Sequence, residues 1–101
     1  MTVQSAKPGG ILRSVGSKIL IIDDDPSFKR LLEVRLRSFM SDAAITSFGT
    51  LGAVREYLQS HKEERFDLVI LDQNLPDGSG VELLEEGWFE DLAVLAVSSD
   101  E

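Results

Sequence analysis

The sequence contains no cysteine and a single histidine, His61. These two scarcities exclude disulfide scaffolds and cysteine-rich zinc sites, which need several such residues. His61 lies in a charged connector, so we interpret it as a solvated side chain rather than a catalytic one. No apolar run approaches the roughly 20 residues of a membrane-spanning helix, and the N-terminus lacks the apolar centre of a secretion signal. We therefore expect a cytoplasmic protein without membrane contact.

Basic residues are scarce as well. The chain of 101 residues has 10 lysines and arginines against 18 aspartates and glutamates, so its net charge is −8. An acidic domain repels phosphates, which argues against direct nucleic-acid binding and favours a metal ion or a basic partner protein. With 43% hydrophobic residues, this length fits one domain with one core.

The N-terminal segment differs from the rest in charge. Lys7, Arg13 and Lys18 make the first 18 residues basic, with no acidic residue among them. Three spread charges make only a weak patch for an anionic surface. We therefore interpret residues 1–17 as a flexible basic leader and residues 18–101 as the domain.

Apolar runs alternate with segments of helical spacing from Lys18 onward. The runs at residues 19–22, 43–48, 67–71 and 92–97 predict strands. Asp25 with Pro26 starts one predicted helix, Thr50 caps a second, and Val81, Leu84 and Trp88 share the face of a short third. The first helix has an apolar face made by Phe28, Leu31, Leu32, Leu36, Phe39 and Met40. This order predicts an α/β fold, a parallel sheet with helices on both faces.

Polar residues follow three of the predicted strands: Asp23 with Asp24, then Asp72, then Ser98. Ligands of open α/β sheets bind beyond the carboxyl ends of the strands, so these side chains are expected in one cleft. Gathered carboxylates repel one another, and a hard divalent cation such as Mg²⁺ relieves this. We interpret Asp23 and Asp24 as the acidic pair that holds Mg²⁺. The simpler interpretation, in which the aspartates only cap and solvate a turn, is kept for Asp25.

The same arrangement indicates a chemistry. A carboxylate that faces a bound Mg²⁺ can attack a phosphoryl group in line, while the metal neutralises charge on the transferring oxygens. In this interpretation Asp72 is the nucleophile and acceptor, and Ser98 supplies a hydroxyl that senses the product.

The segments IDDDP, FDLVILDQNLPDGSG and VLAVSS resemble, in this order and spacing, the receiver domain of two-component response regulators. The resemblance covers residues 18–100. It implies a bacterial signalling protein with a flavodoxin-like doubly wound parallel sheet, and phosphorylation at Asp72. It also implies Mg²⁺, or Mn²⁺, held by Asp24, Asp72 and the backbone carbonyl of Asn74, with Asp23 acting largely through water.

The resemblance assigns further roles around the acceptor. Ser98 takes the switch position, Pro76 and Gly80 match the loop, and Asn74 and Asp100 tune the lifetime of the phosphoryl group. The donor would be a sensor histidine kinase or a histidine phosphotransfer protein. The domain would not be an enzyme, apart from slow self-dephosphorylation.

The sequence departs from this family at its end. Receivers continue past the fourth strand with a helix, a fifth strand and a last helix, whereas this sequence stops at Glu101. The expected sheet is therefore incomplete, with strand order 2-1-3-4, and it lacks the lysine of the fifth strand. Neither Lys18, Lys29 nor Lys62 matches that lysine. We expect the strand at 92–97 to form an exposed edge through which the chain self-associates.

Two alternatives remain open from the sequence. The first is a receiver-like interaction or dimerisation module that cannot be phosphorylated. The second is a haloacid-dehalogenase-like phosphatase, with Asp23 as nucleophile and Asp25 as general acid, which leaves DQNLPDGSG unexplained. Phosphoryl labelling at Asp72, at Asp23 or at neither residue separates the three hypotheses.

Overall fold

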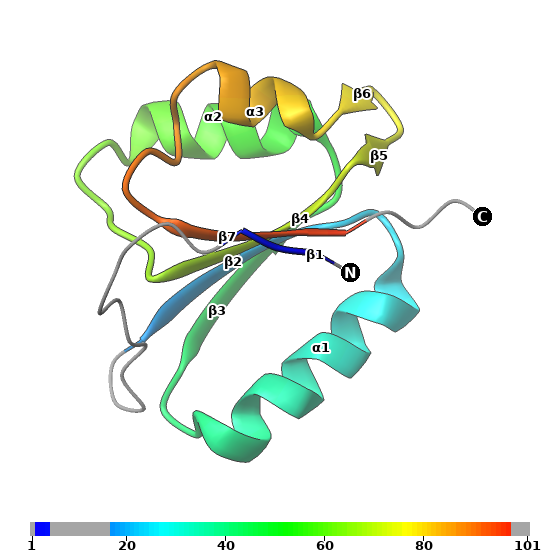
Figure 1. Ribbon diagram of the computed structural model, residues 1–101, viewed down its shortest axis with the longest axis vertical. Coiled ribbons are helices and arrows are strands. Elements are labelled where there is room, and N and C mark those ends of the chain that lie inside the picture. The colour runs from blue at the N-terminus through cyan, green and yellow to red at the C-terminus, as the bar shows by residue number, and fades with distance from the viewer. Residues whose placement is uncertain (1, 5–16, 98–101) are drawn as a thin grey trace.

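The structure, a computed structural model, describes residues 2–4 and 17–97. Strands β2 (Lys18–Ile22), β3 (Ala44–Phe48), β4 (Leu68–Asp72) and β7 (Ala93–Val97) alternate with helices α1 (Pro26–Phe39), α2 (Leu51–Ser60) and α3 (Val81–Glu85). Three short strands complete the fold: β1 (Thr2–Gln4), β5 (Asn74–Leu75) and β6 (Gly78–Ser79). Helices α2 and α3 cover one face of the sheet and α1 covers the other (Figure 1). Across the described ranges, every helix is too short or too polar to cross a membrane.

The main sheet has the order β1-β7-β4-β2-β3. Strands β3, β2, β4 and β7 pair in parallel, so the predicted order 2-1-3-4 and the flavodoxin-like arrangement are confirmed. From β2 the chain moves first to β3 on one side and then to β4 on the other. The strand order therefore reverses between β2 and β4, and ligands of such sheets bind at the carboxyl ends beside this point.

The edge of β7 differs from the prediction. Strand β1 pairs antiparallel with β7 and aligns Thr2 with Ala96, Val3 with Leu95 and Gln4 with Val94. An unpaired strand edge presents N–H and C=O groups that need partners, and here the chain's own N-terminal residues supply them. The prediction of an exposed β7 edge is therefore wrong along these three positions, where residues 2–4 of the predicted leader form the neighbouring strand. Self-association through this edge loses its basis.

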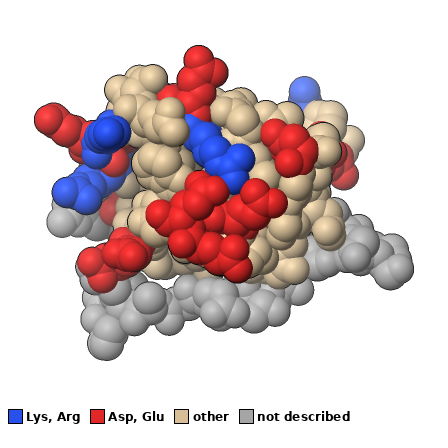
Figure 2. Space-filling model, turned by 90° about the horizontal axis from the view of Figure 1, so that it is seen from above, with Lys and Arg blue, Asp and Glu red and all other residues tan. Residues whose placement is uncertain are grey.

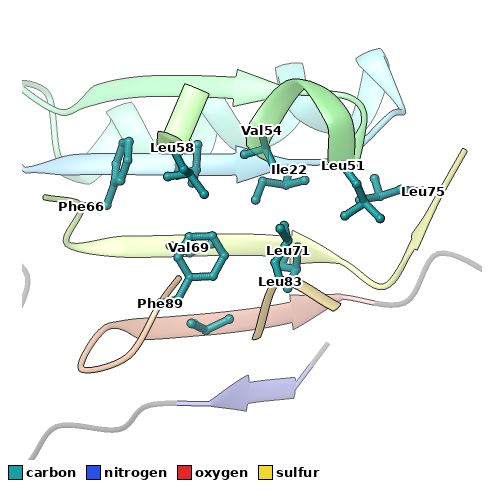
Figure 3. Packing of buried hydrophobic residues seen from close by; sticks show 12 residues of the cluster. Ile22, Leu51, Val54, Leu58, Phe66, Val69, Leu71, Leu75, Leu83 and Phe89 are labelled. Carbon is teal, nitrogen blue, oxygen red and sulfur yellow. The ribbon is translucent and has the colours of Figure 1, made fainter. Parts of the chain in front are cut away.

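Two apolar clusters lie on opposite faces of the sheet. Leu20 and Ile22 of β2 point to the side of α2 and α3, whereas Ile19 and Ile21 point to α1, because side chains alternate along a strand. All four are 0% exposed, as expected for a strand buried on both faces. Figure 3 shows the first cluster, in which side chains from α2, β2, β4 and the segments that follow β4 meet.

Helices α1 and α2 begin where the sequence predicts. The Asp25 carboxylate accepts hydrogen bonds from the backbone N–H groups of Ser27 (2.9 Å) and Phe28 (3.3 Å). The Thr50 hydroxyl accepts one from the N–H of Ala53 (3.1 Å). Both residues therefore act as N-caps.

The inward faces of two helices differ from the predictions. Leu31 of α1 is 49% exposed, so it lies beside the apolar face rather than in it. Helix α3 has only five residues, and its buried side chain is Leu83, whereas Val81 and Leu84 are each 37% exposed. A helix of little more than one turn directs one residue inward, and periodicity alone does not identify which one.

The outer surface formed by α2 and α3 is acidic. Arg55 of α2 joins the two helices, since its guanidinium donates to Glu82 (2.9 Å) and Glu86 (2.6 Å) of the α3 region. The view from above shows acidic side chains gathered on this side of the molecule (Figure 2). The sequence has no lysine or arginine after Arg65, which accounts for the excess of negative charge here.

Candidate functional site

The three aspartates predicted as a metal site lie together at the carboxyl edge of the sheet. Asp72 is the last residue of β4, and Asp23 follows directly after β2, the strand that pairs with β4. One carboxylate oxygen from each of Asp23, Asp24 and Asp72 lies within 4.8 Å of the other two. Two neighbouring parallel strands that end in aspartate thus bring distant parts of the sequence to one point.

Two of these carboxylates are buried and held by the backbone that follows them. Asp23 is 2% exposed and Asp72 is 1% exposed, whereas Asp24 lies at the surface. Asp23 accepts a hydrogen bond from the N–H of Asp25 (2.8 Å), and Asp72 accepts one from the N–H of Asn74 (3.0 Å). Each strand end therefore fixes its carboxylate through the next turn of the chain.

The electrostatics of the cluster oppose its full ionisation. Burial raises the pKa of the Asp23 carboxyl, and the hydrogen bond from the Asp25 backbone acts in the opposite direction. The negative charges of Asp72 and Asp24 raise this pKa further. Carboxylate oxygens are ligands for hard divalent cations, and a cation here would remove the repulsion. The donor set of this cluster fits such an ion.

The loop after Asp72 returns closely to the end of β4. Its base is closed by the Gly80 N–H, which donates to the carbonyl of Gln73 (3.0 Å). A Cβ at Gly80 would lie 2.2 Å from the backbone oxygen of Asp72 and 2.8 Å from a side-chain carbon of Leu71. Only glycine fits there. The sequence predicts turns in this loop, and the structure adds the hairpin β5–β6, with Pro76 exposed between its strands.

The remaining predicted site residues are placed only in part. Ser98 and Asp100 lie outside the described residues. Asn74 is exposed and holds Asp72 through its N–H, which the sequence did not predict. Its assignment as a carbonyl ligand and as a lifetime-tuning residue stays a prediction.

Two charged residues near the site were not predicted as members of it. The position that a Cβ of Gly49 would take is 3.7 Å from the Cα of Asp24 and 4.0 Å from the Nζ of Lys29, so α1 brings an ammonium group to this corner. Its sequence signal is the position of Lys29 in the first turns of the helix that follows the aspartates. The other residue is Asp77, whose carboxylate bonds to the start of α2. This contact joins residues 26 positions apart and leaves no local signal.

Comparison with known proteins gives a consistent result. Residues 19–100 match the family model described as "Response regulator receiver domain". The two-component response regulator ARR11 of Arabidopsis thaliana is 37% identical over 89 residues, which cover 85% of this chain and 16% of that protein. The response regulator protein PilR of Pseudomonas aeruginosa is 40% identical over 68 residues, which cover 67% of this chain and 14% of that protein. The chain thus spans about a sixth of these relatives, and their plant and bacterial sources leave the expectation of a bacterial protein untested.

Solved structures show the same fold. The phosphorylated cyanobacterial phytochrome response regulator RcpA has a TM-score of 0.74 at 23% identity, over 85% of this chain and 67% of that one. The MaeR response regulator bound to beryllium trifluoride has a TM-score of 0.67 at 24% identity, over 84% of this chain and 69% of that one.

Proposed function

The chain belongs to the response regulator receiver domain family, and on this basis we propose that it accepts a phosphoryl group on Asp72 in a phosphorelay. The donor in this proposal is a sensor histidine kinase or a histidine phosphotransfer protein. One observation carries the proposal. Asp72 is the last residue of a parallel strand, and its buried carboxylate has an oxygen within 4.8 Å of an oxygen of each of two further carboxylates. Such a cluster suits phosphoryl transfer far better than it suits stability, because like charges repel.

The proposed step is an in-line displacement. A carboxylate oxygen of Asp72 attacks the phosphorus of a phosphohistidine, an O–P bond forms, and the N–P bond breaks with its electron pair returning to the imidazole. The Asn74 N–H, 3.0 Å from the carboxylate, orients the nucleophile. Burial of Asp72 limits access of water to the product.

The metal in this proposal is Mg²⁺, with Mn²⁺ as a substitute. Asp24, Asp72 and the Asn74 carbonyl would hold it directly, and Asp23 largely through water. When bound, it neutralises the charge that develops on the transferring oxygens. Asp23 keeps its orientation toward the site through its bond from the Asp25 N–H.

Phosphorylation would then shift the domain between two conformations, with Ser98 as the switch hydroxyl. Asn74 and Asp100 would set how long the phosphoryl group persists. We propose no separate substrate and no enzymatic turnover beyond slow hydrolysis of the domain's own aspartyl phosphate.

The two alternatives stand differently. For the phosphatase hypothesis, Asp25 would have to serve as general acid, yet its carboxylate caps α1 through Ser27 and Phe28. Family membership also argues against it. The interaction module that cannot be phosphorylated is the second candidate, and phosphoryl labelling distinguishes it from the proposed acceptor.

The test is the intact mass of the protein after incubation with Mg²⁺ and acetyl phosphate. Parallel samples are the wild type with a chelator and the variants Asp72→Asn, Asp23→Asn and Asp42→Asn. The Asp42→Asn variant is the matched control, because it removes one exposed carboxylate before β3. We expect one added phosphoryl group in the wild type and in Asp42→Asn. It should be absent with Asp72→Asn and reduced with Asp23→Asn and with the chelator. A folded protein that binds Mg²⁺ and gains no mass would favour the interaction module.

A further inference from the structure

The Asp77 carboxylate bridges two separate parts of the fold. Asp77 lies in the turn between β5 and β6, in the loop that follows the proposed acceptor. One of its oxygens accepts a hydrogen bond from the N–H of Leu51 (2.8 Å), and the other accepts one from the N–H of Gly52 (2.9 Å). These are the first two residues of α2. The tip of the loop is therefore fastened to the start of a helix.

This contact completes the capping of α2. The first N–H groups of a helix have no partner within it. Thr50 serves only the later ones: its hydroxyl accepts from Ala53 (3.1 Å) and its carbonyl accepts from Val54 (3.3 Å). Asp77 serves the two that remain, and its negative charge faces the positive end of the helix. The same two hydrogen bonds hold the pKa of Asp77 below its ordinary value.

Apolar packing supports the same joint. The side chains of Leu75 and Leu51 lie next to each other in the core (Figure 3). Leu51 is 0% exposed and Leu75 is 9% exposed. Gly78 has a φ of +146°, and a Cβ there would lie 2.8 Å from a methyl carbon of Leu51. The loop thus rests on α2 too closely for a side chain at Gly78.

The base of the loop belongs to the aspartate cluster. The N–H of Asn74 donates to the Asp72 carboxylate (3.0 Å), and the N–H of Gly80 donates to the carbonyl of Gln73 (3.0 Å). Only two residues, Leu75 and Pro76, separate Asn74 at the cluster from Asp77 at α2. A chain segment this short transmits a displacement of its tip to its base.

We propose that Asp77 is a positioning residue for the aspartate cluster: it anchors the loop on α2 and so fixes the Asn74 backbone beside Asp72. This proposal deepens the proposed function and rests on it. Without the anchor, the Asn74 N–H and carbonyl lose their fixed place at the cluster. The consequences are weaker binding of Mg²⁺ and slower phosphoryl acceptance in a protein that remains folded.

The experiment compares Asp77→Ala and Asp77→Asn with Thr50→Ala. Thr50→Ala removes a cap from the same end of α2 but leaves the loop untouched, so it matches the loss of helix capping without the loss of the anchor. The readouts are Mg²⁺ affinity by calorimetry, the rate of adduct formation with acetyl phosphate, and hydrogen exchange of the Asn74 amide without metal. All are taken well below the unfolding temperature.

We expect Asp77→Ala to weaken Mg²⁺ binding about tenfold, because the Asn74 carbonyl would no longer be held in place at the metal. It should also speed exchange of the Asn74 amide, and Asp77→Asn should recover part of both because its oxygen still accepts one N–H. Thr50→Ala should stay within about twofold of the wild type. If the wild type binds Mg²⁺ and the two variants Asp77→Ala and Thr50→Ala change Mg²⁺ affinity and Asn74 exchange equally, the positioning role alone is overturned. A wild type that neither binds Mg²⁺ nor gains a phosphoryl group would overturn the proposed function, and this proposal with it.

Discussion

Replacing Asp23 by asparagine should stabilise the metal-free protein at neutral pH. Asp23 is 2% exposed, and its pKa is raised by burial and by the charges of Asp72 and Asp24. A group whose pKa is raised on folding contributes stability below its unfolded pKa, about 3.9, and this contribution is lost as pH rises through the folded pKa. At pH 7 the ionised carboxylate therefore destabilises the fold. Asparagine removes the charge and keeps an oxygen that accepts the Asp25 N–H.

The geometry of the cluster sets the magnitude. At the 4.8 Å that bounds the oxygen separations, two unit charges repel by about 1 kcal/mol in water and by about 3.5 kcal/mol at the effective dielectric constant of partly buried sites. The repulsion between Asp23 and the exposed Asp24 is near the lower value, whereas the repulsion between Asp23 and the buried Asp72 is nearer the higher one. After allowance for shared protons and for solvent that enters the site, we expect a gain of about 1–3 kcal/mol.

The assay is urea unfolding at pH 7 and again below pH 4, with and without Mg²⁺. The stability gain of Asp23→Asn should shrink at the lower pH, and Mg²⁺ should stabilise the wild type more than the variant. Asp42→Asn controls for the net charge of −8, because it removes one acidic charge away from the cluster. A metal-free Asp23→Asn protein that is less stable than the wild type at pH 7, or no more stable than Asp42→Asn, would refute the reasoning.

Three further changes test other parts of the site. Gly80→Ala places a Cβ 2.2 Å from a backbone oxygen of β4, so urea unfolding should show a loss of at least about 2 kcal/mol. Gly52→Ala, with its nearest contact at 3.6 Å, should not show this loss, and similar values for both would contradict the steric argument. The pKa of Asp77 is lowered by backbone N–H groups of α2, so its contribution is lost as pH falls through that lowered value. Asp77→Asn should therefore lose less stability than the wild type as pH falls. Parallel curves of unfolding free energy against pH for the two proteins would exclude this role. Lys29→Met should slow phosphoryl acceptance from acetyl phosphate about twofold, and the effect should be smaller at high salt. An unchanged rate would show that Lys29 does not contribute to the site.

The sequence was sufficient for the framework because the framework depends on local patterns. Short apolar runs predict buried strands, and a parallel α/β sheet brings the ends of such strands to one edge. The positions of Asp23 and Asp72 follow from these two facts. The caps at Asp25 and Thr50 are equally local, since a cap needs only its own side chain and the next three residues.

The features that the sequence did not predict depend on long-range partners. Pairing of β1 with β7 joins opposite ends of the sequence, and three residues carry no pattern that would indicate it. Aspartate is common in turns, so Asp77 does not stand out in the sequence. Its role appears only when α2 lies beside the loop. Leu83 faces inward in place of Leu84 because a five-residue helix is too short for its periodicity to decide the buried side.

The most direct test of the central claim is to locate the phosphoryl group. The protein is incubated with Mg²⁺ and acetyl phosphate, the acyl phosphate is reduced with borohydride, and the modified aspartate is identified by peptide mass spectrometry. We predict reduction at Asp72 alone, dependent on Mg²⁺. Modification at Asp23, or no modification in a folded protein that binds Mg²⁺, would contradict the assignment of Asp72 as the phosphoryl acceptor.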